Sequence, residues 1–154
     1  MRDLATAALW NVQTIAADGL KRFHPGARTT GLCWGRGAPG DMLALSEGMA
    51  TAAAIHAATG LCSVAAMTAG NLEVVARAMR RRWPAAAIIV GADLDPVGEA
   101  KAANAARAVA GLIARSPHPS GAPPRGWDFD DALRAMGPYA VRAAFAMPAH
   151  LERN

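Results

Sequence analysis

The chain has 154 residues, the length of one ordinary domain, and its hydrophobic fraction of 53% is sufficient for a buried core. No apolar run approaches the roughly 18 to 20 residues that cross a bilayer, and the start of the chain does not resemble a signal peptide. Cys33 and Cys62 belong to no ligand-spaced pair, so we expect a cytoplasmic protein of a reducing compartment without structural zinc. The formal net charge of +4 permits a polyanionic partner but does not identify one.

Residues 1 to 40 are expected to form a β-rich segment followed by a linker. "LWNVQTI" and "TTGLCW" alternate in a strand-like way and flank "AADGLKRFHPGA", in which Asp18-Gly19 is a hairpin turn signal. We therefore predict a small antiparallel appendage of two or three strands. The next stretch, "GRGAPG", satisfies G-x-G-x-x-G, but a dinucleotide fingerprint must open a helix. Because "DMLAL" follows it and is strand-like, we interpret the glycine-rich stretch as a linker.

Residues 41 to 137 alternate between strand and helix patterns. Strands are predicted at "MLALSEG", "CSVAAMTAG" and "AAIIVGAD", with a last short one at "LIARS". Helices are predicted at "MATAAAIHAAT", which Gly60 ends, at "NLEVVARAMRRRW", with Asn71 as N-cap, and at "PVGEAKAANAARAVAG", with Pro96 in its first turn. This alternation favours an α/β fold with a parallel sheet flanked by helices. The acid-rich "WDFDDALRAMGPYAVRAAFAM" predicts a further helical piece, and residues 138 to 154 are expected to form a C-terminal helix.

Carboxylates follow two of the predicted strands. Glu47 ends the first within "LSEG", and Asp93 and Asp95 end the third within "GADLD". Because ligands bind at the carboxyl ends of parallel strands, these acids converge on one edge of the sheet if the strands are neighbours. Such a cluster repels itself unless protons or cations neutralise it, and oxygen ligands alone favour Mg²⁺ or Mn²⁺. A metal of this kind usually serves phosphate chemistry.

Each acid also has a plainer interpretation. Asp95 precedes a proline and suits a helix N-cap, Asp93 suits a turn, and Glu47 suits a solvated position in the first turn of a helix. A later acidic group suits the favourable start of the last helix: Asp128, Asp130 and Asp131. Taken singly these interpretations are favoured, whereas acids at two strand ends together with the later group favour a site.

At this point the motifs resemble the Toprim domain, which bacterial-type primases, topoisomerases and some nucleases share. "ALSEG" resembles its glutamate motif, and "IIVGADLDPVGEAKAA" resembles its D-x-D-x-x-G-x-x-x-A motif, with Gly98 at the glycine. "WDFDDAL" resembles the later acidic motif of primase Toprim domains. "TAGNLEVVARAMRRRWP" and "NVQTIAADGLKRFHPGARTTG" are similar to plasmid and phage primases of the primase-helicase type. The resemblance implies a Rossmann-like Toprim sheet and covers most of the chain.

The resemblance also implies a two-metal site. Glu47 would be the acid nearest the chemistry, as a metal ligand or general base, and Asp93 and Asp95 would hold Mg²⁺ or Mn²⁺. A second metal site would draw on the later motif: Asp128 with Asp130 or Asp131. Nucleotide or nucleic-acid contacts are expected at four further positions: Lys21, Arg22, Asn71 and Arg77.

The implied function is that of a DNA primase catalytic core, in which a 3′-hydroxyl attacks the α-phosphate of an NTP on a single-stranded DNA template. A Toprim nuclease and a non-catalytic nucleic-acid-binding accessory domain of replication are the alternatives. A topoisomerase is disfavoured because it needs a tyrosine nucleophile in a separate module, and the single tyrosine, Tyr139, lies near the end of the chain. Family primases usually carry an N-terminal zinc module and often a downstream helicase. We therefore expect either a core cut from a longer primase-helicase or a short stand-alone relative, and either could prime poorly alone.

Overall fold

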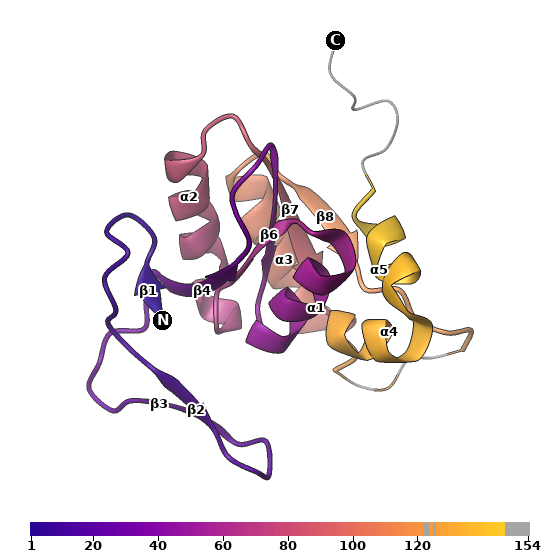
Figure 1. Ribbon diagram of the computed structural model, residues 1–154, viewed down its shortest axis with the longest axis horizontal. Coiled ribbons are helices and arrows are strands. Elements are labelled where there is room, and N and C mark those ends of the chain that lie inside the picture. The colour runs from indigo at the N-terminus through magenta and orange to yellow at the C-terminus, as the bar shows by residue number, and fades with distance from the viewer. Residues whose placement is uncertain (122–123, 125, 147–154) are drawn as a thin grey trace.

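The computed structural model describes residues 1–121, 124 and 126–146. Within this range a six-stranded sheet of order β1-β4-β6-β5-β7-β8 is flanked by helices, and a two-stranded sheet projects from it (Figure 1). Four neighbouring strands of the larger sheet run parallel: β6 (Cys62–Ala65), β5 (Met42–Ser46), β7 (Ala87–Ala92) and β8 (Leu112–Arg115). The predicted α/β fold with a parallel core is confirmed.

A helix follows each of the first three parallel strands along the chain. α1 (Met49–Thr59) follows β5 and ends at Gly60, which adopts a left-handed φ of 76°. α2 (Leu72–Arg82) follows β6 after a short 3₁₀ turn, η1 (Ala69–Asn71). α3 (Pro96–Ala108) follows β7, and its first residue is the proline expected in the first turn. The predicted alternation from residue 41 onward is therefore present.

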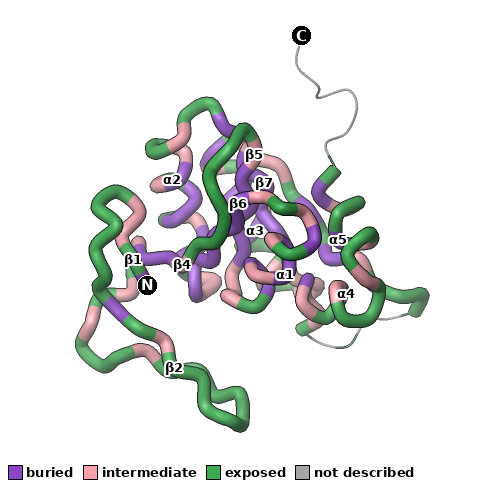
Figure 2. The backbone as a smooth tube through the Cα atoms, viewed as in Figure 1, coloured by how far each residue is buried: buried purple, intermediate pink, exposed green. Residues whose placement is uncertain are grey.

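Different helices cover the two faces of the sheet, because alternate residues of a strand point to opposite sides. Leu43 and Leu45 of β5 pack with residues of α2 and α3. Ala44, between them, packs on the other side with α1, α4 (Phe129–Met136) and α5 (Pro138–Ala144). Figure 2 shows the central strands buried between these two helical layers. The carboxyl end of the parallel strands is thus an edge between two packed faces.

Phe129, the first residue of α4, is fully buried against the sheet. Gly91 of β7 makes room for it, because a Cβ at this glycine would lie 3.1 Å from a ring carbon of Phe129 and 3.3 Å from Cδ1 of Ile55. The ring also packs against Phe145, with centroids 5.2 Å apart. α4 and α5 are therefore part of the core, and the start of α4 is held beside β7.

The N-terminal appendage is a hairpin that projects from the main sheet (Figure 1). β2 (Gln13–Ile15) pairs antiparallel with β3 (Lys21–Phe23). The turn between them contains Gly19 with φ 84°, as the hairpin signal predicted. Most residues of the hairpin are exposed (Figure 2).

The strand predicted over "TTGLCW" lies in the larger sheet and not in the appendage, which corrects the prediction. β4 (Leu32–Arg36) pairs antiparallel with β6 on one side and with the short β1 (Arg2–Asp3) on the other. Leu32 and Cys33 are buried there, so joining the core hides apolar surface that a small hairpin would leave in water. The linker is correspondingly shorter, because the first two residues of "GRGAPG" belong to β4. The division of the chain at residues 40 and 137 stays a prediction.

The helical piece predicted at the end of the chain consists of two helices. α4 stops and α5 starts at Gly137, which has φ 80° and is followed by Pro138, a residue suited to the first turn of a new helix. The C-terminal helix expected over residues 138 to 154 extends to Ala144, and residues 147–154 lie outside the described part of the chain. No helix in the described residues has the length and apolar character needed to cross a membrane.

Candidate functional site

The structure brings the acids of the two strand ends together. β5 and β7 are direct neighbours, with Leu45 opposite Val90. Glu47 directly follows the end of β5, and Asp93 directly follows the end of β7. Both acids therefore lie at the carboxyl edge of the parallel strands, where ligands of open α/β sheets bind.

Asp93 is the most perturbed acid of this edge. Burial, and then the negative charges of Asp128, Glu47 and Asp95, raise the pKa of Asp93 from 3.8 to about 7. Its Oδ1 is buried and has no hydrogen-bond partner among the described residues. A buried carboxylate oxygen without a partner is costly for the fold, and it is a position suited to a cation.

Glu47 is half-buried beside Asp93. Burial is the main cause that raises the pKa of Glu47, and the charge of Asp95 acts in the same direction. The backbone N–H of Ala69 opposes this rise. The carbonyl of Glu47 accepts a hydrogen bond of 2.8 Å from the backbone N–H of Met67, which adopts a left-handed φ of 72°. The segment after β6 is therefore hydrogen-bonded to the residue that follows β5, and the donor of this bond, Met67, has a strained backbone conformation.

Asp95 is the N-cap of α3, as its plainer interpretation predicted. Its Oδ1 accepts hydrogen bonds of 2.9 Å from the backbone N–H groups of Val97 and Gly98. No hydrogen bond to Oδ2 is seen within the described part of the chain, so capping leaves one oxygen for a ligand. A Cβ at Gly98 would lie 3.1 Å from this Oδ2 and 3.3 Å from Cβ of Asp93. The glycine therefore lets the start of α3 approach both aspartates.

Asp128 lies beside the cluster and also holds two helices. Its Oδ1 accepts from the backbone N–H groups of Asp130, at 2.7 Å, and Asp131, at 3.1 Å, which caps α4. Its Oδ2 accepts a hydrogen bond of 2.6 Å from Oγ1 of Thr51, a buried residue of α1. Both oxygens are thus engaged while the charge acts on Asp93. Thr51 was not among the predicted residues, and its signal in the sequence is a hydroxyl in the first turn of an alanine-rich helix.

The carboxylates of Asp130 and Asp131 make local contacts at the start of α4. Oδ2 of Asp130 pairs with Nε of Arg134 at 2.9 Å, and Oδ2 of Asp131 accepts from the backbone N–H of Asp128 at 3.2 Å. Neither belongs to the charges that raise the pKa of Asp93. Among the described residues, no group of three histidine, cysteine or acidic side chains is arranged to hold a metal ion, and this applies to Glu47, Asp93 and Asp95 as well. Both metal sites expected from the sequence, including the second one at Asp128 with Asp130 or Asp131, stay predictions.

Lys21 is the predicted phosphate contact that lies near the acids. Its positive charge lowers the pKa of both Asp93 and Glu47. Ile15 lies opposite Lys21 in the hairpin, and Phe23 shares this face and packs beside the start of α1. The hairpin is thus anchored beside α1, and the charge of its lysine acts on both carboxyl groups.

The other predicted basic contacts lie elsewhere. Arg22 follows Lys21 and therefore points to the opposite face of the hairpin, where Thr14 lies across from it. Arg77 pairs with Glu73 along α2, with Nη2 and Oε1 2.8 Å apart. Neither arginine acts on the pKa of Glu47 or Asp93.

Asn71 occupies the N-cap position of α2, but its side chain does not cap the helix, which corrects the prediction. Nδ2 donates to the carbonyls of Ala66, at 2.7 Å, and Leu32, at 2.8 Å, and Oδ1 accepts from the backbone N–H of Gly31 at 2.7 Å. The buried amide joins the start of β4 to the end of β6, because these strands meet there and leave backbone groups to satisfy. Its predicted contact with a nucleotide or nucleic acid stays a prediction.

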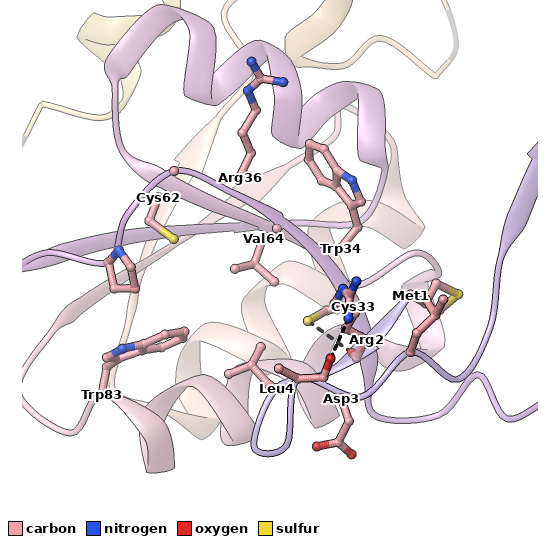
Figure 3. A pocket seen from close by; sticks show the side chains of 15 residues that line it. Met1, Arg2, Asp3, Leu4, Cys33, Trp34, Arg36, Cys62, Val64 and Trp83 are labelled. Atoms are coloured by element: carbon pink, nitrogen blue, oxygen red, sulfur yellow. Dashed lines mark hydrogen bonds between the residues drawn. The ribbon is translucent and has the colours of Figure 1, made fainter.

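A cavity of about 480 Å³ lies away from the acids, beside β1, β4 and β6. Cys33, Cys62 and Val64 line it on one side of the strands, with Leu4 and Trp83 facing them (Figure 3). Burial is the main cause that raises the pKa of Cys33 to about 11, so the thiol stays protonated at neutral pH. This space lies apart from the acids, and the candidate chemistry belongs to the edge of the sheet.

The fold and its acidic edge define a Toprim domain. The family model described as "Toprim domain" matches residues 42–139, and the chain belongs to this family, which confirms the resemblance predicted from the motifs. Two relatives are the proteins named DNA primase TraC of Escherichia coli, 37% and 35% identical over 116 residues. Each alignment covers 66% of this chain, but only 8% and 11% of the respective relatives. The chain therefore spans a small part of the length of these curated relatives. No solved structure matches it.

Proposed function

We propose that this chain is the catalytic core of a primase-type nucleotidyltransferase, which makes RNA primers on single-stranded DNA. The observation that carries the proposal is the acidic edge, where the half-buried Asp93 has a buried oxygen without a partner and feels the charges of Glu47 and Asp95. Mutually repelling, partly buried acids destabilise a fold, so their convergence favours a site that binds cations. The relatives named DNA primase support primer synthesis over other phosphate chemistry.

Mg²⁺ or Mn²⁺ fits the residues of this edge. Oδ1 of Asp93 and Oδ2 of Asp95 are carboxylate oxygens without a hydrogen bond in the described structure, and hard divalent cations prefer oxygen ligands. Glu47 supplies a third carboxylate at the same edge. A bound divalent cation would polarise phosphate oxygens and offset the charge that develops on them in the reaction.

The chain's own side chains have distinct proposed roles. Glu47, whose pKa is raised, takes the proton from the 3′-hydroxyl that attacks the α-phosphate of the NTP, and pyrophosphate leaves as the α–β phosphoanhydride bond breaks. Lys21, whose charge acts on both acids, contacts the triphosphate of the NTP. Asp128 accepts a hydrogen bond from Thr51 and so joins the start of α4 to α1. This contact positions the carboxylate of Asp128 beside Asp93.

The proposed substrates are NTPs and a single-stranded DNA template, and the proposed location is the cytoplasm. A replicative helicase or further domains of a longer chain are the proposed partners, since the relatives extend far beyond the matched segment. Either arrangement would supply template binding that the core alone provides weakly.

The test combines the full chain with end-labelled single-stranded DNA, NTPs and Mg²⁺ or Mn²⁺, with labelled NTP in a parallel reaction. Asp93→Asn should reduce new RNA products at least about 100-fold. Asp41→Asn is the matched control, because it removes the same charge at an exposed position directly before β5, at the opposite end of the strand. Shortened DNA that disappears in Asp93→Asn would instead identify a nuclease. Manganese binding without either product would indicate an accessory domain or a core that needs further domains to prime.

A further inference from the structure

A second surface, on the N-terminal appendage, takes no part in the proposed chemistry. Leu9, Trp10 and Val12 are 59%, 55% and 49% exposed although they are large and apolar. Together with His24 they line a shallow hollow of about 330 Å³. We call Leu9, Trp10, Val12, His24 and Arg28 the Trp10 surface. A contiguous group of exposed large apolar side chains usually marks an interaction site, whereas single exposed ones carry no such meaning.

The Trp10 surface contains a fixed cation. The guanidinium carbon of Arg28 lies 5.1 Å from the centroid of the Trp10 ring, within the range of a cation–π contact. Nη2 of Arg28 also donates to Oδ2 of Asp3 at 2.7 Å. The arginine is thus held from two sides, while more than half of Trp10 stays open to solvent.

A buried amide makes this arrangement rigid. Asn11 is 3% exposed, and its Nδ2 donates to the carbonyls of Arg28, at 3.0 Å, and Ala27, at 3.2 Å. Its Oδ1 accepts from the backbone N–H groups of Val12, at 2.7 Å, and His24, at 3.1 Å. The loop that carries Arg28 is therefore fixed to the strand that follows Trp10. A site already ordered before binding loses little conformational entropy when a ligand arrives.

An exposed aromatic ring beside fixed and neighbouring cations suits one class of partner. Single-stranded nucleic acids stack their bases on aromatic side chains while their phosphates meet basic residues, whereas a duplex hides the faces of its bases. Arg22 and Lys21, on opposite faces of the adjoining hairpin, add positive charge nearby. We propose that the Trp10 surface binds a single-stranded nucleic acid, with one base stacked on Trp10 and a neighbouring phosphate at Arg28. This contact goes beyond the proposed reaction and needs neither metal nor NTP.

The test titrates a fluorescein-labelled oligothymidylate with the full chain, without metal or NTP, and follows fluorescence anisotropy. Trp10→Ala should weaken binding roughly 5- to 100-fold, while Trp10→Phe keeps most of the affinity because a ring is retained. Tyr139→Ala is the matched control, since this ring is 81% exposed on α5 and should change affinity less than about twofold. Circular dichroism of each variant checks that the fold is intact.

The cation is tested through salt dependence. Arg28→Gln should lower the slope of log affinity against log salt by about 0.7. Arg134→Gln removes an arginine that also pairs with an aspartate, but on α4, and should leave the slope unchanged.

Three results would overturn the proposal: unchanged affinity in Trp10→Ala, equal affinity for an abasic strand, or equal affinity for duplex DNA. This binding is measured without metal or NTP, whereas the proposed primer synthesis requires both. Failure at the Trp10 surface is therefore distinguishable from failure of the catalytic proposal.

Discussion

Asp93 should destabilise the metal-free protein as the pH rises. Burial and the charges of Asp128, Glu47 and Asp95 raise its pKa from 3.8 to about 7. Between these values the folded state keeps a proton that the unfolded chain releases, so the free energy of unfolding falls with increasing pH until about pH 7. Each pKa unit corresponds to about 1.4 kcal/mol, which makes the full penalty roughly 2 to 4 kcal/mol after allowance for solvent screening.

Asp93→Asn keeps the shape of the side chain and removes its charge. Near pH 8 the variant should escape the full penalty, but near pH 5 it should escape only the smaller part that has developed there. The gain in the free energy of unfolding should therefore grow by about 1 to 3 kcal/mol between these conditions, or roughly 2 to 12 °C in Tm. An amide that lacks a buried partner costs the same at both pH values, so the difference isolates the charge.

The assay is thermal unfolding of the metal-free full chain at both pH values, followed by circular dichroism. Asp41→Asn, at an exposed position directly before β5, should show no such pH-dependent gain. Added Mn²⁺ should raise the Tm of the unaltered protein more than that of Asp93→Asn. A gain that is equal at both pH values, or that shrinks near pH 8, would refute the electrostatic argument.

Three further predictions concern neighbours of the site. Gly98→Ala should weaken Mn²⁺ binding in a calorimetric titration, because its Cβ would press on Oδ2 of Asp95 from 3.1 Å; unchanged affinity would show that this oxygen is not a ligand. Asn71→Ala should lower the free energy of unfolding in urea by about 2 to 4 kcal/mol, since it strips partners from several buried backbone groups; a loss below about 1 kcal/mol would contradict this role. Lys21→Gln should raise the pKa of Asp93, measured by a carbon-13 carboxyl titration, because the positive charge of the lysine lowers this pKa in the unaltered protein. An unchanged pKa would show that the lysine lies too far from Asp93 to act on it.

Much of the core could be predicted because its signals are local. Gly60 ends α1 through its own backbone conformation, and the proline that follows Asp95 starts α3. The meeting of Glu47 with Asp93 followed from topology, since parallel neighbours end at the same edge. The interpretation of Asp95 as a cap and its prediction as a ligand proved compatible, because capping uses one of its two oxygens.

The predictions that were wrong concern residues whose partners lie far away in the sequence. β4 carries an ordinary strand pattern, and nothing within it specifies that it joins β6 rather than the hairpin. Asn71 stands at a good capping position, yet the backbone groups of Leu32 and Ala66 compete for its amide more effectively than its own helix does. Asp130 differs from these two cases, because its partner Arg134 is only four residues away and pairs with it at the start of α4.

The position of β4 has a consequence for the order in which a growing chain can fold. β2 and β3 are close in sequence and can pair as soon as they are made, but β4 needs β6, and its first residues also need Asn71. Until the ribosome has made these residues, the hairpin is followed by a β4 segment that is not yet held in the sheet. The first two residues of β4, which are buried in the folded chain, stay open to contact with other chains during that interval, which makes this strand the place where misassembly during synthesis would begin.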